Sequence, residues 1–149
     1  MVILLGQGIG MVLALNAAFL WPSAALPLPL LWFWLDIVFI ISGRLLRRHC
    51  QRILGASFTG AVIVRAEQAI VQRGAYRYVR HPSYSAGMLL FLGIGLATGN
   101  WIGTLAIVVA SGATYVYRVR VEERALLATV AERYSDYMRR TKRFVPGVV

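Results

Sequence analysis

The sequence is poor in charge and almost without cysteine. Only 15% of its 149 residues are charged, against about a quarter in soluble globular domains, and only six are Asp or Glu. A disordered chain is excluded, because 58% of the residues are hydrophobic. Cys50 is the single cysteine, which excludes an internal disulfide scaffold and leaves no second thiol for a metal site, so we predict no metal. The length allows one domain, and the composition indicates a small membrane protein.

In place of charge the chain has long uncharged runs. The first extends from Val2 to Trp21 and is long enough to cross the roughly 30 Å hydrocarbon core as a helix. A cleaved signal peptide is the competing interpretation, because small residues follow at 23–25. No Lys or Arg precedes the run, however, and this favours a retained helix. Three prolines then interrupt the chain around the start of a second apolar run, 28–43.

The second half of the chain predicts a helical hairpin. Apolar runs at 83–98 and 101–117 are separated by the turn signal Gly99-Asn100. Beyond residue 117, apolar side chains recur every three or four residues between Arg and Glu, which predicts an amphipathic helix that continues the fourth span. The stretch 44–82, with short apolar patches at 61–64 and 69–71, has no clear period, and we expect an ordered aqueous or interfacial loop there.

These patterns together predict an all-α, polytopic membrane protein with about four transmembrane helices. Its single domain would contain two N-terminal transmembrane helices (1–43), a basic segment (44–82), a transmembrane helical hairpin (83–117), and a C-terminal amphipathic helix and tail (118–149).

The sixteen basic residues fall into two segments. Eight lie between the second and third apolar runs and eight after the fourth, and the formal net charge is +10. The positive-inside rule then predicts four spans, with both termini and both basic segments on the cytoplasmic side of the cytoplasmic membrane. Attraction to anionic membrane lipids would account for this charge by itself. Nucleic-acid binding is not expected, because no readout chemistry accompanies the charge.

Two polar clusters flank the predicted hairpin. One, 74–87, opens its first helix, and the other, 118–124, leaves its second. A short turn makes the two helices antiparallel, so we expect the clusters to meet at the cytoplasmic membrane edge. Each cluster also has a plainer interpretation, since His81-Pro82 suits a simple helix start and Glu122 and Glu123 suit ion pairs with nearby arginines. Asp36 in the second run is costly in a membrane and is a functional or helix-pairing candidate.

The motifs resemble a known family when taken in order. G-x-Y-R-Y-V-R-H-P-S-Y, V-E-E-R-A-L-L, Y-x-x-Y and R-F-V-P, over about residues 70–147, are similar to the isoprenylcysteine carboxyl methyltransferase and phospholipid methyltransferase family. The resemblance implies a membrane enzyme that uses S-adenosyl-L-methionine to methylate a lipid-like acceptor at the cytoplasmic bilayer surface. Its cofactor-binding positions carry over to Arg80, His81, Tyr84, Gly93, Gly95, Glu122 and Glu123.

The sequence departs from the family pattern at small residues. Ala75 stands where the family often has Pro, and Ala131 replaces a frequent Gly before the tyrosine pair. Ala86 occupies a position that is commonly Gly, with Gly87 one place late. For Gly93 and Gly95, close helix packing is an alternative to cofactor contact.

The chemistry of the acceptor is open at this point. An amine acceptor needs a base, for which His81 and Glu123 are candidates, whereas a carboxylate acceptor needs only orientation by an arginine such as Arg77 or Arg143. A membrane reductase with a nicotinamide cofactor has a similar C-terminal pattern and is one alternative function. A small four-helix transporter or assembly subunit without catalysis is another, and Asp36 would then be the sensitive residue.

Overall fold

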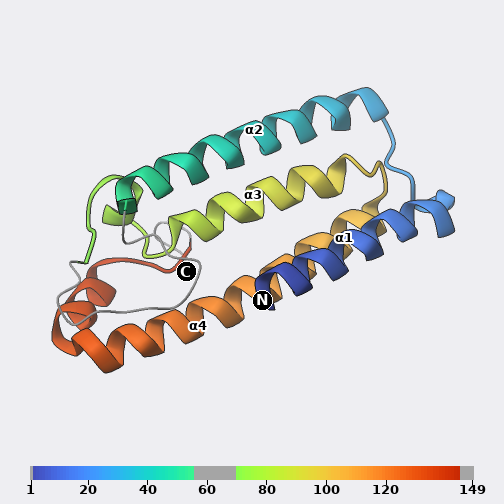
Figure 1. Cartoon of the computed structure of the whole chain (residues 1–149). Helices are drawn as coiled ribbons and strands as arrows, with labels where there is room; N and C mark the ends of the chain where they lie inside the picture. The colour runs from blue at the N-terminus through green and yellow to red at the C-terminus, as the bar shows by residue number, and fades with distance from the viewer. Residues whose placement is uncertain (1, 56–69, 145–149) are drawn as a thin grey trace.

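The computed structural model describes residues 2–55 and 70–144, and these contain four α-helices (Figure 1). They are α1 (Val2–Leu20), α2 (Pro29–Leu54), α3 (Pro82–Leu96) and α4 (Trp101–Arg140), with short 3-10 turns at Pro22–Ala24 and Gly74–Arg77. The described part of the chain has no β-strand, so the all-α prediction is confirmed. In Figure 1, α3 lies between α2 and α4, and α1 packs along the first half of α4.

Three of the described helices, α1, α2 and α4, are long and apolar enough to cross a membrane. The fourth, α3, is apolar but has only 15 residues. At 1.5 Å per residue it is about 22 Å long, shorter than the roughly 30 Å hydrocarbon core. The helical hairpin formed by α3 and α4 is present as predicted, while a count of four complete spans stays a prediction.

The second helix is longer than its apolar run. We expected a loop from residue 44, but α2 continues to Leu54 and carries Arg44, Arg47, Arg48 and Arg52 on helical turns. Leu and Arg are both good helix formers, and the next helix-breaking residue is Gly55, which has a φ of +53°. The charge pattern correctly marked the end of the apolar run but not the end of the helix. The apolar patch at 61–64 lies outside the described residues.

Small residues set the distances between the helices. A Cβ on Gly10 of α1 would lie 2.8 Å from the Ala110 side chain, and one on Gly103 of α4 would lie 2.8 Å from the Ala14 carbonyl. Between α2 and α3, a Cβ on Gly43 would come within 2.6 Å of the Leu90 backbone nitrogen. Glycine at such contacts lets helix backbones approach, which is a common packing device between membrane helices.

The turn between α3 and α4 is tied to the other connection. Asn100 is 2% exposed, and its side-chain oxygen accepts a hydrogen bond from the Gly103 N–H (3.1 Å), which caps α4. Its amide nitrogen donates to the Trp21 carbonyl (2.9 Å) at the end of α1. The predicted Gly99-Asn100 turn is therefore present, and the same asparagine holds the α1–α2 connection against it.

Beyond the apolar part, α4 continues as the predicted amphipathic helix but bends at Val130. The φ and ψ of Val130, −132° and 40°, are not helical, and the last turns fold back toward the start of α3 (Figure 1). Val130, Tyr134 and Tyr137 form a buried cluster, against which Ile70 and Leu126 pack. The bend places residues 141–144 over the N-terminus of α3.

Candidate active site

A C-terminal strap, Thr141–Phe144, closes over the start of α3. The backbone N–H groups of Arg80 and His81 donate to the carbonyls of Lys142 (2.7 Å) and Arg143 (3.0 Å). Ser85 Oγ donates to the Phe144 carbonyl (2.7 Å). The first two bonds pair backbone N–H groups at the start of α3, and all three hold the strap against the first of the two predicted clusters, 74–87.

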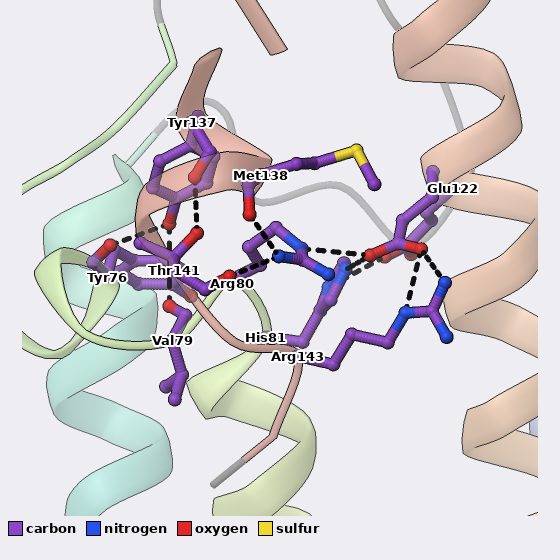
Figure 2. Close-up of polar contacts among 10 residues, drawn as sticks. Tyr76, Val79, Arg80, His81, Glu122, Tyr137, Met138, Thr141 and Arg143 are labelled. Atoms are coloured by element: carbon purple, nitrogen blue, oxygen red, sulfur yellow. Dashed lines mark hydrogen bonds and ion pairs between the residues drawn. The ribbon is translucent and has the colours of Figure 1, made fainter. Parts of the chain in front are cut away.

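Arg80 joins the strap to α4. Its Nε donates to Glu123 Oε1 (3.1 Å), and its Nη1 donates to the carbonyls of Met138 (3.2 Å) and Thr141 (Figure 2). The side chains of Arg80 and Glu123 are only 8% and 5% exposed. Beside them, the Tyr137 hydroxyl donates to the Tyr76 carbonyl (2.6 Å). Arg80 therefore uses much of its guanidinium on protein partners.

Glu123 is buried between cations. Its second oxygen, Oε2, accepts from Arg143 Nε (3.0 Å) and Nη2 (2.8 Å), while Arg80 binds Oε1. Burial by itself raises the pKa of Glu123, but the neighbouring His81, Arg143 and Arg80 outweigh it and lower the pKa to about 2. Glu123 is thus a carboxylate that stays ionised and is saturated by its neighbours.

Glu122 is bound differently from Glu123. Its Oε1 accepts from the Tyr84 hydroxyl (2.6 Å) and from Arg118 Nε (2.8 Å). Its Oε2 lies 3.8 Å from His81 Nδ1, too far for a hydrogen bond, and the side chain is 22% exposed. Adjacent acids on one helix thus have distinct surroundings, with Glu122 the more open of the two.

His81 and Tyr134 each bury a polar atom that has no hydrogen-bond partner in the described part of the chain. These atoms are His81 Nε2 and the Tyr134 hydroxyl. His81 Nε2 is 3.4 Å from Glu123 Oε1, but no hydrogen bond joins the two atoms. The imidazole lies near the rings of Tyr84 and Phe144, with centroids 5.8 and 6.3 Å away. Such atoms are costly without a partner, so a ligand with polar groups fits this position.

A second set of residues, one from each of four helices, meets beside the first. We name it the Tyr115 junction, and its members are Gln7, Arg47, Gly87 and Tyr115. Gln7 Nε2 donates to the Tyr115 hydroxyl (3.0 Å). A Cβ on Gly87 would lie 3.0 Å from Arg47 Nη1 and closer still to the Tyr115 hydroxyl oxygen. The Tyr115 and Tyr84 rings are 5.0 Å apart, which connects the junction to Glu122 through the Tyr84 hydroxyl.

Sequence reasoning missed this junction. Its members lie in four different helices, and only the displaced Gly87 was noticed. Arg47 also donates from Nη1 to the Ser83 carbonyl at the start of α3 (3.2 Å), an interaction possible because α2 remains helical past residue 43. The available signal was Gly87 itself, since a glycine at that point admits a bulky polar group from a neighbouring helix.

The structure brings together six of the predicted site residues, which we call the polar cluster: Arg80, His81, Tyr84, Glu122, Glu123 and Arg143. Three others lie apart from it. Arg77 is exposed, and no described contact joins it to the polar cluster. Gly93 and Gly95 lie about three helical turns into α3, where a Cβ would meet Ile40 of α2 and Ile107 of α4 at 2.8 Å. Helix packing accounts for both glycines, and their contact with a cofactor stays a prediction.

A family model and several curated proteins match the sequence. The sequence model described as phospholipid methyltransferase matches residues 27–133. Protein-S-isoprenylcysteine O-methyltransferase B of Arabidopsis thaliana is 31% identical over 114 residues, which cover 75% of this chain and 58% of that protein. Cobalt-zinc-cadmium resistance protein CzcN of Cupriavidus metallidurans is 33% identical over 82 residues, 55% of this chain and 38% of that protein.

A solved structure has the same fold. The eukaryotic intramembrane Ras methyltransferase ICMT (isoprenylcysteine carboxyl methyltransferase) matches with a TM-score of 0.75 at 22% identity, over 97% of this chain and 52% of that chain. The chain spans about half the length of the relatives it matches.

Proposed function

The chain belongs to the phospholipid methyltransferase family, and we propose that it transfers a methyl group from S-adenosyl-L-methionine to the carboxylate of a lipid-like acceptor. The reaction forms an oxygen–carbon bond at the acceptor and breaks a sulfur–carbon bond in the cofactor, whose thioether leaves with the electron pair. A carboxylate acceptor releases no proton, so the chain has only to position two molecules and exclude water. Positioning of this kind supplies roughly 7–11 kcal/mol in the most favourable cases.

The observation that supports the cofactor assignment is the mixture of charges around the unpartnered His81 Nε2. S-adenosyl-L-methionine carries an ammonium, a carboxylate and ribose hydroxyls, and this polar cluster offers partners of both signs within a few ångströms. We assign Glu122, whose Oε2 is open, to the ammonium or a hydroxyl of the cofactor. His81 Nε2 and the Tyr134 hydroxyl complete the set, and the cofactor supplies the methyl group.

Arg80 and Glu123 have a different part in this proposal. Both are buried and bound to protein groups, and a carboxyl with a pKa of about 2 is a weak base at neutral pH. We assign them to positioning: they hold the strap and His81 in place. Arg143, whose side chain is 44% exposed, is the member of the polar cluster that the strap supplies.

The acceptor assignment rests on Arg47. A guanidinium recognises a carboxylate with paired N–H donors, and it lies beside the aromatic pair Tyr84 and Tyr115. The apolar surface of the helices around it suits the lipid portion of such an acceptor. The names of the methyltransferase relatives point to an S-isoprenylcysteine, and we propose this class of acceptor for the chain. Arg44, Arg48 and Arg52 at the end of α2 are exposed and suit anionic head groups on the cytoplasmic side.

Two measurements test the proposal. Calorimetry with S-adenosyl-L-methionine on detergent-purified protein should show binding that Glu122→Gln weakens about tenfold or more, since hydrogen bonds to charged groups contribute about 1.5–3 kcal/mol. Glu132→Gln, an exposed acid on the same helix, is the matched control and should leave binding unchanged. Binding that is absent, or equal in both variants, contradicts the cofactor assignment.

The second measurement is methyl transfer to N-acetyl-S-farnesylcysteine compared with phosphatidylethanolamine vesicles. Transfer to the cysteine carboxylate is expected. Transfer to the amine alone contradicts the acceptor assignment and returns His81 to the role of base.

A further inference from the structure

The hydroxyl of Tyr115 is the point where the four described α-helices meet. Tyr115 belongs to α4 and is 3% exposed. Gln7 from α1 binds the hydroxyl, Arg47 from α2 lies against it, and Gly87 of α3 leaves room for both. A polar group at such a position has its orientation fixed by every helix around it.

The proton of the Tyr115 hydroxyl is not accepted by Gln7 or Arg47. A phenol has one proton to donate and two positions that accept. The Gln7 amide donates to the oxygen, and a guanidinium has donors only, so neither of these neighbours takes the Tyr115 proton in the described arrangement. The proton therefore remains for a group that is not part of these contacts.

That free donor lies next to the proposed site. The Tyr115 ring is 5.0 Å from the Tyr84 ring, and the Tyr84 hydroxyl binds Glu122 in the polar cluster (2.6 Å). Arg47 Nη1 and the Tyr115 hydroxyl oxygen both lie within 3.0 Å of the position that a Cβ on Gly87 would occupy. A hydroxyl donor beside a guanidinium is an arrangement that binds an anion.

We propose that Gln7 is a positioning residue for the methyl acceptor. By donating to the Tyr115 oxygen, Gln7 turns the hydroxyl proton toward the acceptor carboxylate, which Arg47 holds from α2. This inference rests on the proposed function, and it gives α1 a part in acceptor recognition although the first helix lies outside the family match at 27–133.

Helix packing alone does not require Gln7. The first helix meets α4 through small residues, with Gly6 facing Thr114 and Gly10 facing Ala110. The other polar side chain of α1, Asn16, donates to the Val12 carbonyl of its own helix (2.7 Å). Asn16→Leu is therefore the matched control for Gln7→Leu.

The experiment measures KM and kcat for N-acetyl-S-farnesylcysteine and the dissociation constant of S-adenosyl-L-methionine, in full-length protein. Gln7→Leu should raise the acceptor KM about five- to tenfold, as expected for one lost hydrogen bond, with kcat within about twofold and cofactor affinity unchanged. Tyr115→Phe should do the same, and the double variant should be no worse than either single one. Asn16→Leu should match the wild type.

Gln7→Glu separates positioning from shape. Glutamate has nearly the same shape but accepts the Tyr115 proton and pairs with Arg47, so the acceptor KM should rise more than in Gln7→Leu. Three results would refute this role for Gln7. They are additive effects of the two substitutions on the acceptor KM in the double variant, a Gln7→Glu protein that behaves like the wild type, and a shift in cofactor affinity. If Gln7→Leu has wild-type turnover and an unchanged acceptor KM, only the role assigned to Gln7 is refuted. If the wild-type protein binds the cofactor but methylates neither probe, the proposed function is refuted as well.

Discussion

Removal of Glu123 should destabilise the protein far more than removal of Arg143, although the two residues form one ion pair. Glu123→Ala leaves the Arg80 side chain, 8% exposed, with a charge and no carboxylate. Breaking a buried pair in this way costs about 3–5 kcal/mol. Arg143→Ala removes a side chain that is 44% exposed and leaves Glu123 bound to Arg80. Pairs of that kind contribute about 1 kcal/mol or less.

The pKa of Glu123 gives a second route to the same magnitude. A fall from 4.5 to about 2 corresponds to roughly 3 kcal/mol of stability at neutral pH. The folded-state pKa is the lower one, so this contribution is fully present above about pH 4.5 and is lost as the pH falls toward 2. The stability difference between wild type and Glu123→Gln should narrow over the same range.

Cys50 provides the assay. It is the single cysteine and is fully buried, so a thiol-reactive fluorogenic dye reports unfolding of the detergent-solubilised protein at one position. For a chain of this size, 1 kcal/mol shifts Tm by about 2–4 °C. Glu123→Ala should therefore lower Tm by about 6–20 °C, and Arg143→Ala by about 2–4 °C or less. An Arg143→Ala shift as large as that of Glu123→Ala would refute the asymmetry on which this reasoning depends.

Three further outcomes are expected from the packing and the hydrogen bonds. Gly43→Ala should lower Tm by several degrees in the same dye assay, because the added Cβ would lie less than 3 Å from backbone atoms of Leu90 and Ala86. Gly8→Ala is the control and should not lower Tm, because a Cβ there would have nothing within 4 Å. Equal Tm shifts in the two variants would contradict the α2–α3 contact. Tyr84→Phe should weaken S-adenosyl-L-methionine binding about fivefold or more in calorimetry by releasing Glu122, and unchanged binding would separate that bond from the cofactor site. Asp36→Asn should retain methyl transfer, because the Asp36 backbone packs against Gly93, about three helical turns from the start of α3 where the polar cluster lies. Loss of transfer would favour a function through the second span.

Much of the fold followed from local patterns in the sequence. The uncharged runs and the Gly99-Asn100 turn placed α1, α3 and the start of α4, because a helix that meets lipid must be apolar and a turn needs residues that permit it. The extent of α2 did not follow, since Arg and Leu remain helical in water as well as in a membrane, so a change in polarity was mistaken for a change in structure. The bend at Val130 also left no local mark, because it depends on where Tyr134 and Tyr137 pack.

The sequence by itself predicted that most of the polar cluster would meet, because the motifs around His81 and Glu122 lie at the open end of the α3–α4 hairpin. Arg143 joins them only through the bend at Val130, which the sequence did not reveal. The division of roles within the polar cluster came only from the tertiary structure. Adjacent acids look equivalent in a sequence, yet Glu123 turns into buried cations and Glu122 toward Tyr84.

The Tyr115 junction was decided by the tertiary structure alone. Gln7, Arg47, Gly87 and Tyr115 come from four helices, and 108 residues separate the Gln7 amide from the hydroxyl it binds. No spacing along one helix predicts such a meeting, because it depends on how closely glycine contacts allow the four helices to approach. Hydropathy places each helix in the membrane, but only the packing of one helix against another determines which side chains share a hydrogen bond.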